Sequence, residues 1–361
     1  MDIYVNEKAA RNGNGTKESP FQTITQAAQI ARPGDTVLVA PGVYREYVDP
    51  QRGGISDDLR IRYISPEKGG AVITGAEPVK GWEPYEKDVW TVRIPNGLFG
   101  DYNPYTTLVE GDWFIPFTPT HTGEVYLNGK AMYEACSLED VLAPQVFLPS
   151  WDPDFTLYKW YTRQEDDCTV LYANFQGADP NRENVEINVR RNCFYPSQTG
   201  RGFITLSGFV IKQAATQWAP PTAYQEGMVG PHWSKGWIIE DCEISDSKCS
   251  GISLGKYRQE GNDNKWLHKK YKDGTQTERE CICQAQAEGW SKETIGSHIV
   301  RRCNIHDCGQ PPSSLELEVM DRHNGFHAPE EHISLKLCIQ IYRNETSLPV
   351  MTVNNLRLEI D

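Results

Sequence analysis

Three carboxylates lie close together between residues 241 and 246, and paired carboxylates can act as general acid, general base or nucleophile. Asp241 and Glu243 alternate here with Cys242 and Ile244, and Asp246 follows two residues after Ile244. One reaction that such a pair can catalyse is retaining hydrolysis of a glycosidic bond. It needs two carboxylates about 5–5.5 Å apart, one as nucleophile and one as proton donor. If the apolar residues point inward, Asp241 and Glu243 point outward on one face. A catalytic pair would then need a carboxylate from a neighbouring segment.

An internal repeat identifies that neighbouring segment. Residues 298–308 align without a gap on residues 237–247. The matched pairs are Ile238 with Ile299, Ile239 with Val300, Cys242 with Cys303, and Ile244 with Ile305. Self-similar units of short strands are typical of a solenoid, because one unit cannot bury its apolar side alone. We expect Phe209, in a looser third copy, to stack with Cys242 and Cys303 in one inward ladder.

The matching unit offers basic and neutral partners rather than carboxylates. Arg301, Arg302 and Asn304 lie where a catalytic partner of Asp241 or Glu243 would be needed. The pattern therefore favours a charged surface on which Arg301 or Arg302 forms an ion pair. The catalytic residues stay unassigned.

The first 78 residues are predicted to form an N-terminal cap and the first coils. Thr23 and Gln26 fit a capping box at the start of a helix, and Pro33-Gly34 ends that helix. Ile24, Ala27, Ala28 and Ala31 fall on one helical face. Short strands are expected at residues 3–5, 35–39, 59–64 and 71–75, with a corner at 41–44. The helix would cover the open end of the solenoid.

Residues 79–198 interrupt this rhythm with longer strands of alternating polarity. Asn128-Gly129 predicts a hairpin turn between residues 125–127 and 131–133. We interpret the segment as an inserted antiparallel β-sandwich-like domain. Coils resume over residues 199–310, with a strand at 251–254 and a long loop at 256–293, and residues 311–361 form an atypical tail. The predicted fold class is all-β.

The composition and net charge limit the kinds of ligand and partner that we expect the chain to bind. The 361-residue chain has a net charge of −13, which disfavours nucleic acid but is compatible with neutral carbohydrate. No run of 18 apolar residues and no signal peptide is found, so we expect no membrane association. The ten cysteines are then expected to be free thiols in a reducing, cytoplasmic compartment. The sequence leaves open whether the chain forms a homo-oligomer.

Aromatic residues beside predicted coils are candidates for binding a sugar. Trp113 follows Gly-Asp in the inserted domain, and Trp218, His232 and Trp233 border a Pro-rich loop. Aromatic rings with a polar edge suit sugar rings, although the same residues can simply pack their loops. The Cys281-x-Cys283 pair has no second pair at ligand spacing. The sequence predicts no metal and no cofactor.

Several motifs resemble those of one enzyme family. Residues 19–24, 33–37 and 41–46 are similar to the start of pectin-lyase-like right-handed β-helices. More specific are Asn103-Pro104-Tyr105, Gly111-Asp112-Trp113, and residues 172–180, 218–222 and 233–241. Together they resemble the β-xylosidases of glycoside hydrolase family 120 over residues 1–310. The resemblance implies a right-handed parallel β-helix with an inserted β-sandwich, and retaining removal of xylose from short xylo-oligosaccharides.

The chain departs from that family at its other end. The family's carboxylates lie in Asp-Trp-Glu and Val-Glu-Val motifs, and neither motif occurs in this sequence. Residues 311–361 look like the product of a truncation, frameshift or junction. We therefore expect the N-terminal part of a β-xylosidase-like enzyme with weak or absent turnover.

Two other functions stay open. One is a non-catalytic carbohydrate-binding or structural β-helix. The other is a pectate-type polysaccharide lyase, which needs a Ca²⁺ site of clustered carboxylates and binds acidic pectin. No such cluster is visible in the sequence, and a charge of −13 suits pectin badly.

Overall fold

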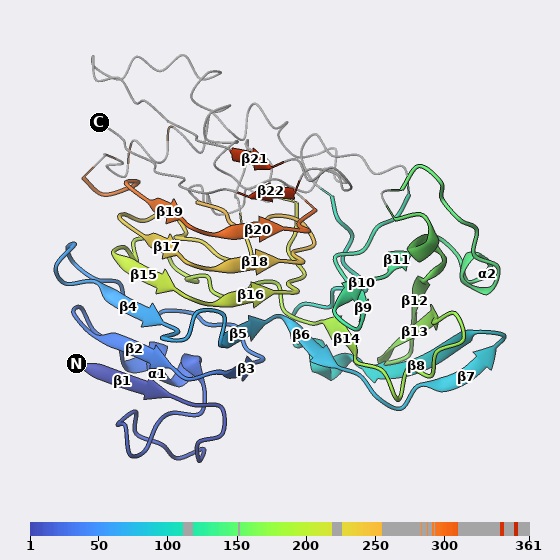
Figure 1. Ribbon diagram of the computed structural model, residues 1–361, viewed down its shortest axis with the longest axis horizontal. Helices are drawn as coiled ribbons and strands as arrows, with labels where there is room; N and C mark the ends of the chain where they lie inside the picture. Colours follow the sequence, from blue (N-terminus) through green and yellow to red (C-terminus); the bar gives the residue numbers. More distant parts are fainter. Residues whose placement is uncertain are drawn as a thin grey trace. The chain divides into compact units, whose positions relative to one another are not determined.

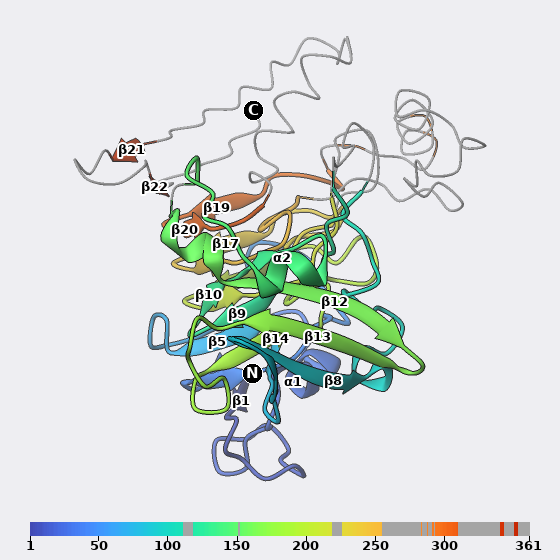
Figure 2. The same cartoon turned by 90° about the vertical axis from the view of Figure 1, so that its right-hand side faces the viewer.

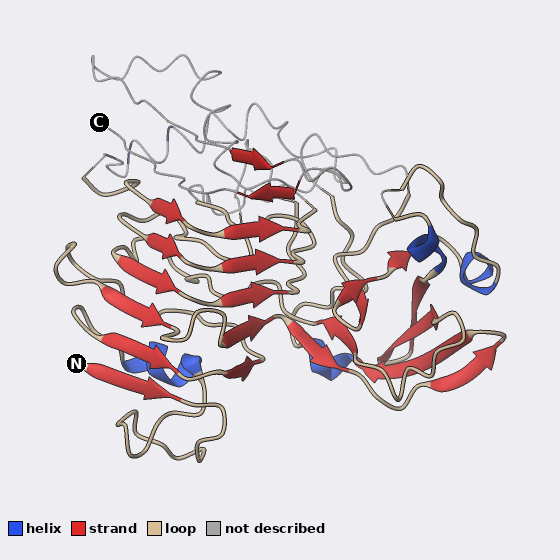
Figure 3. Cartoon of the chain, viewed as in Figure 1, coloured by secondary structure: helices blue, strands red, loops and turns tan. Residues whose placement is uncertain are grey.

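Strands dominate the chain and helices are few, so the fold is all-β (Figures 1 and 3). The computed structural model describes residues 1–110, 118–150, 152–218, 226–254, 283, 287, 291, 293–309, 340–342 and 350–352. The chain divides into two compact units. Unit 1 comprises residues 1–74, 110–115 and 192–361, and unit 2 comprises residues 75–109 and 116–191. In the described part of the chain, no helix is both long enough and apolar enough to cross a membrane.

Two parallel sheets run through unit 1 (Figure 1). The first has the order β1 (Asp2–Val5), β2 (Thr36–Val39), β4 (Ile61–Ile64), β15 (Ile204–Ser207), β17 (Ile238–Glu240) and β19 (Ile299–Arg301). The second has the order β3 (Gly42–Tyr44), β5 (Ala71–Thr74), β16 (Val210–Lys212), β18 (Glu243–Ser245) and β20 (Asn304–His306). From β2 onward, the chain of unit 1 alternates between the two sheets. We call one strand from each sheet, with its connections, a coil.

The strand register confirms the repeat predicted from the sequence. Ile238 pairs with Ile299 in the first sheet, and Ile244 pairs with Ile305 in the second. Phe209, Cys242 and Cys303 are all buried, with exposed fractions of 0%, 2% and 2%. The predicted inward ladder is therefore present, because like residues of successive coils stack on one another.

A third line of contacts closes each coil. Single parallel bridges join Val48 to Phe194, Phe194 to Val229, and Val229 to Ile252. The prediction of a full strand at residues 251–254 was wrong, because only Ile252 makes such a bridge. Ser245 ends β18 and is buried.

The corners between the sheets use the left-handed backbone region. Gly208, Asp241 and Arg302 occupy equivalent corners with φ of 83°, 55° and 53°. Glycine is required at the first of these, because a Cβ at Gly208 would lie 2.5 Å from the carbonyl oxygen of Ser65. Asp adopts this region more readily than most residues, which explains a carboxylate at this corner.

Helix α1 (Ile24–Ile30) forms as the sequence predicts. Thr23 is its N-cap and forms a capping box with Gln26. Ile24, Ala27, Ala28 and Ala31 are fully buried in the core of unit 1. The interpretation of residues 41–44 as a corner was wrong, because Gly42–Tyr44 forms β3 and pairs with β5.

Unit 2 is built from two further sheets that share one buried core, to which Val125, Trp160 and Leu171 contribute. Figure 2 shows β12, β13 and β8 side by side. One sheet has the order β10 (Lys130–Ala131), β9 (Val125–Leu127), β14 (Val185–Asn188) and β6 (Ala76–Pro78). The other has the order β11 (Tyr133–Glu134), β12 (Lys159–Glu165), β13 (Cys168–Asn174), β8 (Val89–Pro95) and β7 (Glu83–Glu86). All pairings are antiparallel except β11 with β12.

Short helices and one tight turn complete unit 2. They are η1 (Asn96–Phe99), α2 (Leu138–Leu142) and η2 (Asp154–Leu157). The predicted hairpin turn is present, with φ of 52° at Asn128 and 85° at Gly129 between β9 and β10. The boundaries at residues 79 and 198 stay predictions.

The tail contributes two described strands, β21 (Gln340–Tyr342) and β22 (Val350–Thr352), which pair antiparallel. Most of the predicted loop at residues 256–293 lies outside the described residues.

Candidate functional site

Of the four aromatic residues predicted to bind sugar, Trp113 lies outside the described residues and Trp218 is half-buried. The backbone N–H of Trp218 donates to Oε1 of Gln217 at 2.8 Å. The same oxygen accepts from the backbone N–H of Glu110 at 3.1 Å. Gln217 therefore fixes the chain around Glu110 next to Trp218, within unit 1.

His232 is held firmly by its own surroundings. Its side chain is buried, and its ring stacks on Tyr195 with centroids 5.1 Å apart. Nδ1 lies 2.6 Å from the carbonyl oxygen of Pro196. Because a carbonyl can only accept, Nδ1 must carry the proton. In this structure His232 anchors its loop, and contact with a substrate stays a prediction.

Trp233 follows in a tight backbone turn. Both His232 and Trp233 have left-handed backbones, with φ of 46° and 56°. Trp233 is half-buried, and its carbonyl accepts from the N–H of Gly200 at 3.1 Å. Two successive residues in this region are costly unless neighbouring contacts hold them. The hydroxyl of Ser234 supplies such a contact by donating to the carbonyl of Pro231 at 2.8 Å.

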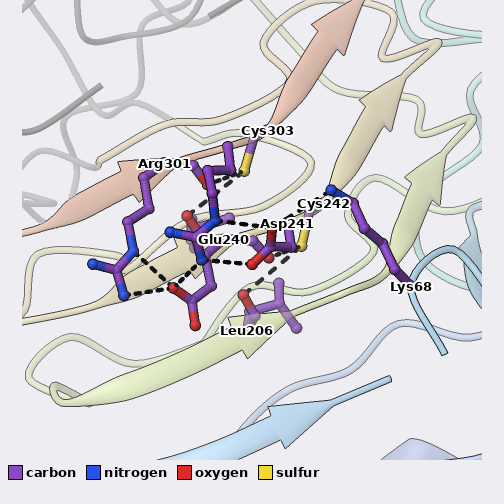
Figure 4. A network of polar contacts seen from close by, with 9 residues as sticks. Lys68, Leu206, Glu240, Asp241, Cys242, Arg301 and Cys303 are labelled. Atoms are coloured by element: carbon purple, nitrogen blue, oxygen red, sulfur yellow. Dashed lines mark hydrogen bonds and ion pairs between the residues drawn. The ribbon is translucent and has the colours of Figure 1, made fainter. Parts of the chain in front are cut away.

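The predicted charged surface is a network of ion pairs that joins coils of unit 1 (Figure 4). Arg301 lies 2.7 Å from Glu240, and Arg302 lies 2.6 Å from Asp241 and 3.0 Å from Glu240. Lys68 approaches Asp241 at 3.5 Å. The hydrogen bond from Arg302 lowers the pKa of the Asp241 carboxyl. The prediction that an arginine pairs with Asp241 is confirmed, and this carboxylate is engaged as an ion-pair partner.

The structure brings Asp246 to a partner that the sequence reasoning overlooked. Asp307 occupies the same corner one coil further on, with φ of 52° against 54° at Asp246. Burial raises the pKa of the Asp246 carboxyl, and the charge of Asp307 raises it further. The repeat alignment already matched these two residues, so the signal was present in the sequence.

Both carboxylates of this pair are already bound. Ser245 donates its hydroxyl to Asp246 at 2.8 Å, and Nδ1 of His306 lies 2.7 Å from Asp307. Glu243, the third predicted carboxylate, lies 3.5 Å from the other ring nitrogen of His306. The contact between Glu243 and His306 ties β18 to β20. Among the described residues, no group of three or more His, Cys, Asp or Glu side chains is placed to hold a metal ion.

Two segments of the chain match models of known protein families. Residues 79–187 match the family model described as "Glycoside hydrolase 120, insertion domain", and residues 8–51 match "Protein of unknown function (DUF1565)". The chain is 34% identical over 73 residues to the uncharacterized protein YwoF of Bacillus subtilis (strain 168), covering 20% of this chain and 15% of YwoF.

Two solved structures are similar to the chain. The structure titled "The complex structure of XylC with xylose" is 46% identical, with a TM-score of 0.82, and the match covers 86% of this chain and 50% of XylC. A structure titled "Glycoside hydrolase" is 12% identical with a TM-score of 0.45, over 85% of this chain and 73% of that one. The chain thus spans half the length of XylC. The predicted resemblance to glycoside hydrolase family 120 is confirmed: residues 79–187 match this family's insertion domain, and 86% of the chain is similar to part of XylC.

Proposed function

We propose that this chain is part of a β-xylosidase-like glycoside hydrolase that binds short xylo-oligosaccharides. The observation that carries the proposal is the match to XylC, whose structure is titled as a complex with xylose. The match to the family's insertion domain supports it independently. A neutral sugar is also compatible with a chain whose net charge is −13.

The proposal includes a right-handed parallel β-helix in unit 1, capped by α1, with unit 2 as an inserted β-sandwich. The parallel strand order and the stacked register of the coils support the first part. The two sheets and shared core of unit 2 support the second. The free thiols of Cys242 and Cys303, buried in the core, are compatible with the proposed cytoplasmic location.

We propose weak or absent turnover for this chain. The family's two carboxylate motifs do not occur in its sequence. Asp241, the first alternative, is bound to Arg302, and its lowered pKa is the opposite of what a proton donor needs. A non-catalytic, carbohydrate-binding role is the second candidate, and it needs no catalytic carboxylate at Asp241.

Calorimetry with xylobiose tests the binding part of this proposal. Wild-type protein should bind xylobiose, and Trp218→Ala should bind it roughly three- to tenfold more weakly, because an aromatic contact contributes about 0.5–1.5 kcal/mol. Phe147→Ala is the matched control, since Phe147 is 60% exposed and lies outside the predicted sugar wall. Equal affinities of wild type and Trp218→Ala would overturn the role of Trp218. Formation of an unsaturated, absorbing product from pectate would instead favour the lyase.

A further inference from the structure

A histidine in unit 2 is held by a carboxylate in a way that leaves one ring nitrogen open. Oε2 of Glu134 accepts from the backbone N–H of His121 at 2.9 Å, and Oε1 lies 2.5 Å from Nδ1 of the ring. Glu134 belongs to β11, whereas His121 belongs to a separate hairpin. No sequence motif joins the two residues, so sequence reasoning did not find the pair.

Backbone contacts pair residues 107–109 with residues 120–122 on either side of His121. Leu108 and His121 form an antiparallel bridge. Val109 donates to the carbonyl of Thr120 at 2.7 Å, and Thr122 donates to the carbonyl of Thr107 at 2.8 Å. The backbone on both sides of His121 is thereby fixed, and Glu134 fixes the ring. Such double support is how proteins hold a side chain ready for a ligand.

The open nitrogen of this pair is Nε2. The side chains of His121 and Glu134 are 21% and 11% exposed, so solvent reaches the ring while the carboxylate is nearly covered. Among the described residues, Nε2 of His121 has no hydrogen-bond partner. With the Nδ1 proton directed at Glu134, Nε2 of the neutral ring accepts a hydrogen bond, and in the charged ring it donates one.

These properties select the class of ligand. A hydroxyl group can donate or accept, so it suits Nε2 in either protonation state. The His121–Glu134 pair has a net charge of zero or −1, so it offers no net positive charge for a carboxylate or phosphate ligand. The net charge of −13 on the whole chain points the same way.

We propose that His121, oriented by Glu134, binds a hydroxyl group of a neutral sugar in the insertion domain. This inference rests on the proposed function, because xylose supplies the neutral hydroxyl-bearing ligand. His121 acts here as a binding residue, and Glu134 acts through it as a positioning residue.

Calorimetric titration with xylose tests the inference. His121→Ala removes the ring but keeps the backbone N–H that Glu134 binds, so the hairpin stays attached. We expect xylose to bind roughly tenfold more weakly, as for one lost hydrogen bond, with the melting temperature within about 2 °C of wild type. His121→Gln, whose amide can take the place of Nε2, should recover most of the affinity. Thr118→Ala, an exposed position on the same hairpin, is the matched control and should bind xylose like wild type.

The outcomes separate the two proposals. Unchanged xylose affinity in His121→Ala would overturn this inference and leave the proposed function standing. Absence of xylose binding by wild type would overturn the proposed function and this inference with it. Glucuronate binding as tightly as xylose would contradict the assignment to neutral sugars. If His121→Ala does not fold, NMR of the wild-type imidazole decides: saturating xylose must shift the His121 ring signals, and unshifted signals would overturn the inference.

Discussion

At the scale of single residues, charged side chains of unit 1 join coil to coil. Glu240 and Asp241 lie on one coil and Arg301 and Arg302 on the next, so each ion pair spans two coils (Figure 4). Neighbouring coils of a solenoid are held together by main-chain hydrogen bonds, and such ion pairs add to them. Asp241, one of the carboxylates that first suggested catalysis, thus has a structural role.

Arg302→Ala tests this role. Arg302 binds two carboxylates at a partly exposed site, so its loss should lower the free energy of unfolding by roughly 0.5–1 kcal/mol at pH 7 and low salt. Asp241 has a lowered pKa in the folded state, so its contribution is present above the ordinary carboxyl pKa and is lost as pH falls through the folded value. Urea denaturation should therefore show the two proteins converging below about pH 4.

Lys68→Ala is the control for Arg302→Ala. Its ammonium group lies 3.5 Å from Asp241 and makes one contact with it, so the loss should be smaller. A difference between wild type and Arg302→Ala that is equally large at pH 3 and pH 7 would contradict the assignment.

Asp246→Asn should change the free energy of unfolding at pH 7 in the opposite direction to Arg302→Ala. Burial, with a contribution from Asp307, raises the pKa of Asp246 in the folded state. Its favourable contribution is fully present below the ordinary carboxyl pKa and is lost as pH rises through the folded value. Removing the charge should leave the protein as stable as wild type or more stable at pH 7, and the advantage should vanish below about pH 4. Asn also tolerates the left-handed backbone at this corner.

Thermal melts across this pH range check the Asp246→Asn prediction. Asp58→Asn, at an exposed loop position, serves as the control and should follow wild type. A variant markedly less stable than wild type at pH 7 would show that the charged form of Asp246 is the favoured one.

At the scale of elements, helix α1 is capped from two sides. Thr23 and Gln26 form the local capping box. In addition, the carboxylate of Glu46 accepts from the backbone N–H groups of Ile24 and Thr25, each at 2.8 Å. Acidic groups stabilise the N-terminus of a helix both by these bonds and by interaction with its dipole.

Glu46→Ala should therefore destabilise unit 1 more than Thr23→Ala does. We expect about 1–3 kcal/mol for the loss of a charged group that accepts two backbone bonds, against about 1 kcal/mol for the N-cap hydroxyl. Urea denaturation measures both, and Glu46→Gln should lie between wild type and Glu46→Ala. A larger loss for Thr23→Ala would show that the local box dominates.

The elements also show what the sequence alone can predict. The register of β17 with β19 could be predicted, because stacked coils repeat the same apolar positions and a self-alignment is then a spatial alignment. The capping box at Thr23 and the Asn128-Gly129 turn could be predicted because their interactions are local.

The features that the sequence did not predict depend on contacts between residues far apart in the sequence. Gly42–Tyr44 looks like a turn, and only its pairing with β5 makes it a strand. The contacts of Glu46 with α1, and of Glu134 with His121, join residues that no motif connects. For the candidate sugar site, the types of residue could be predicted from the sequence. The packing of His232 on Tyr195 could not, because it depends on the folded coils.

At the scale of the whole molecule, the chain combines a stack of parallel coils with a second unit that matches the family 120 insertion domain. Its similarity to XylC covers half of XylC. As proposed above, we expect this chain to bind sugar without efficient hydrolysis, because Asp241 is bound by arginine and the family's carboxylate motifs do not occur in the sequence.

Incubation with xylobiose tests directly whether the chain binds sugar without hydrolysing it. The purified 361-residue chain is incubated with xylobiose, and the melting temperature and the release of xylose are followed in the same sample. We expect xylobiose to raise the melting temperature, because a ligand that binds only the folded state stabilises it. We also expect xylose to be released at or near the uncatalysed rate. Rapid release of xylose would contradict the account and would require active carboxylates in this chain. An unchanged melting temperature at saturating xylobiose would contradict the sugar-binding function itself.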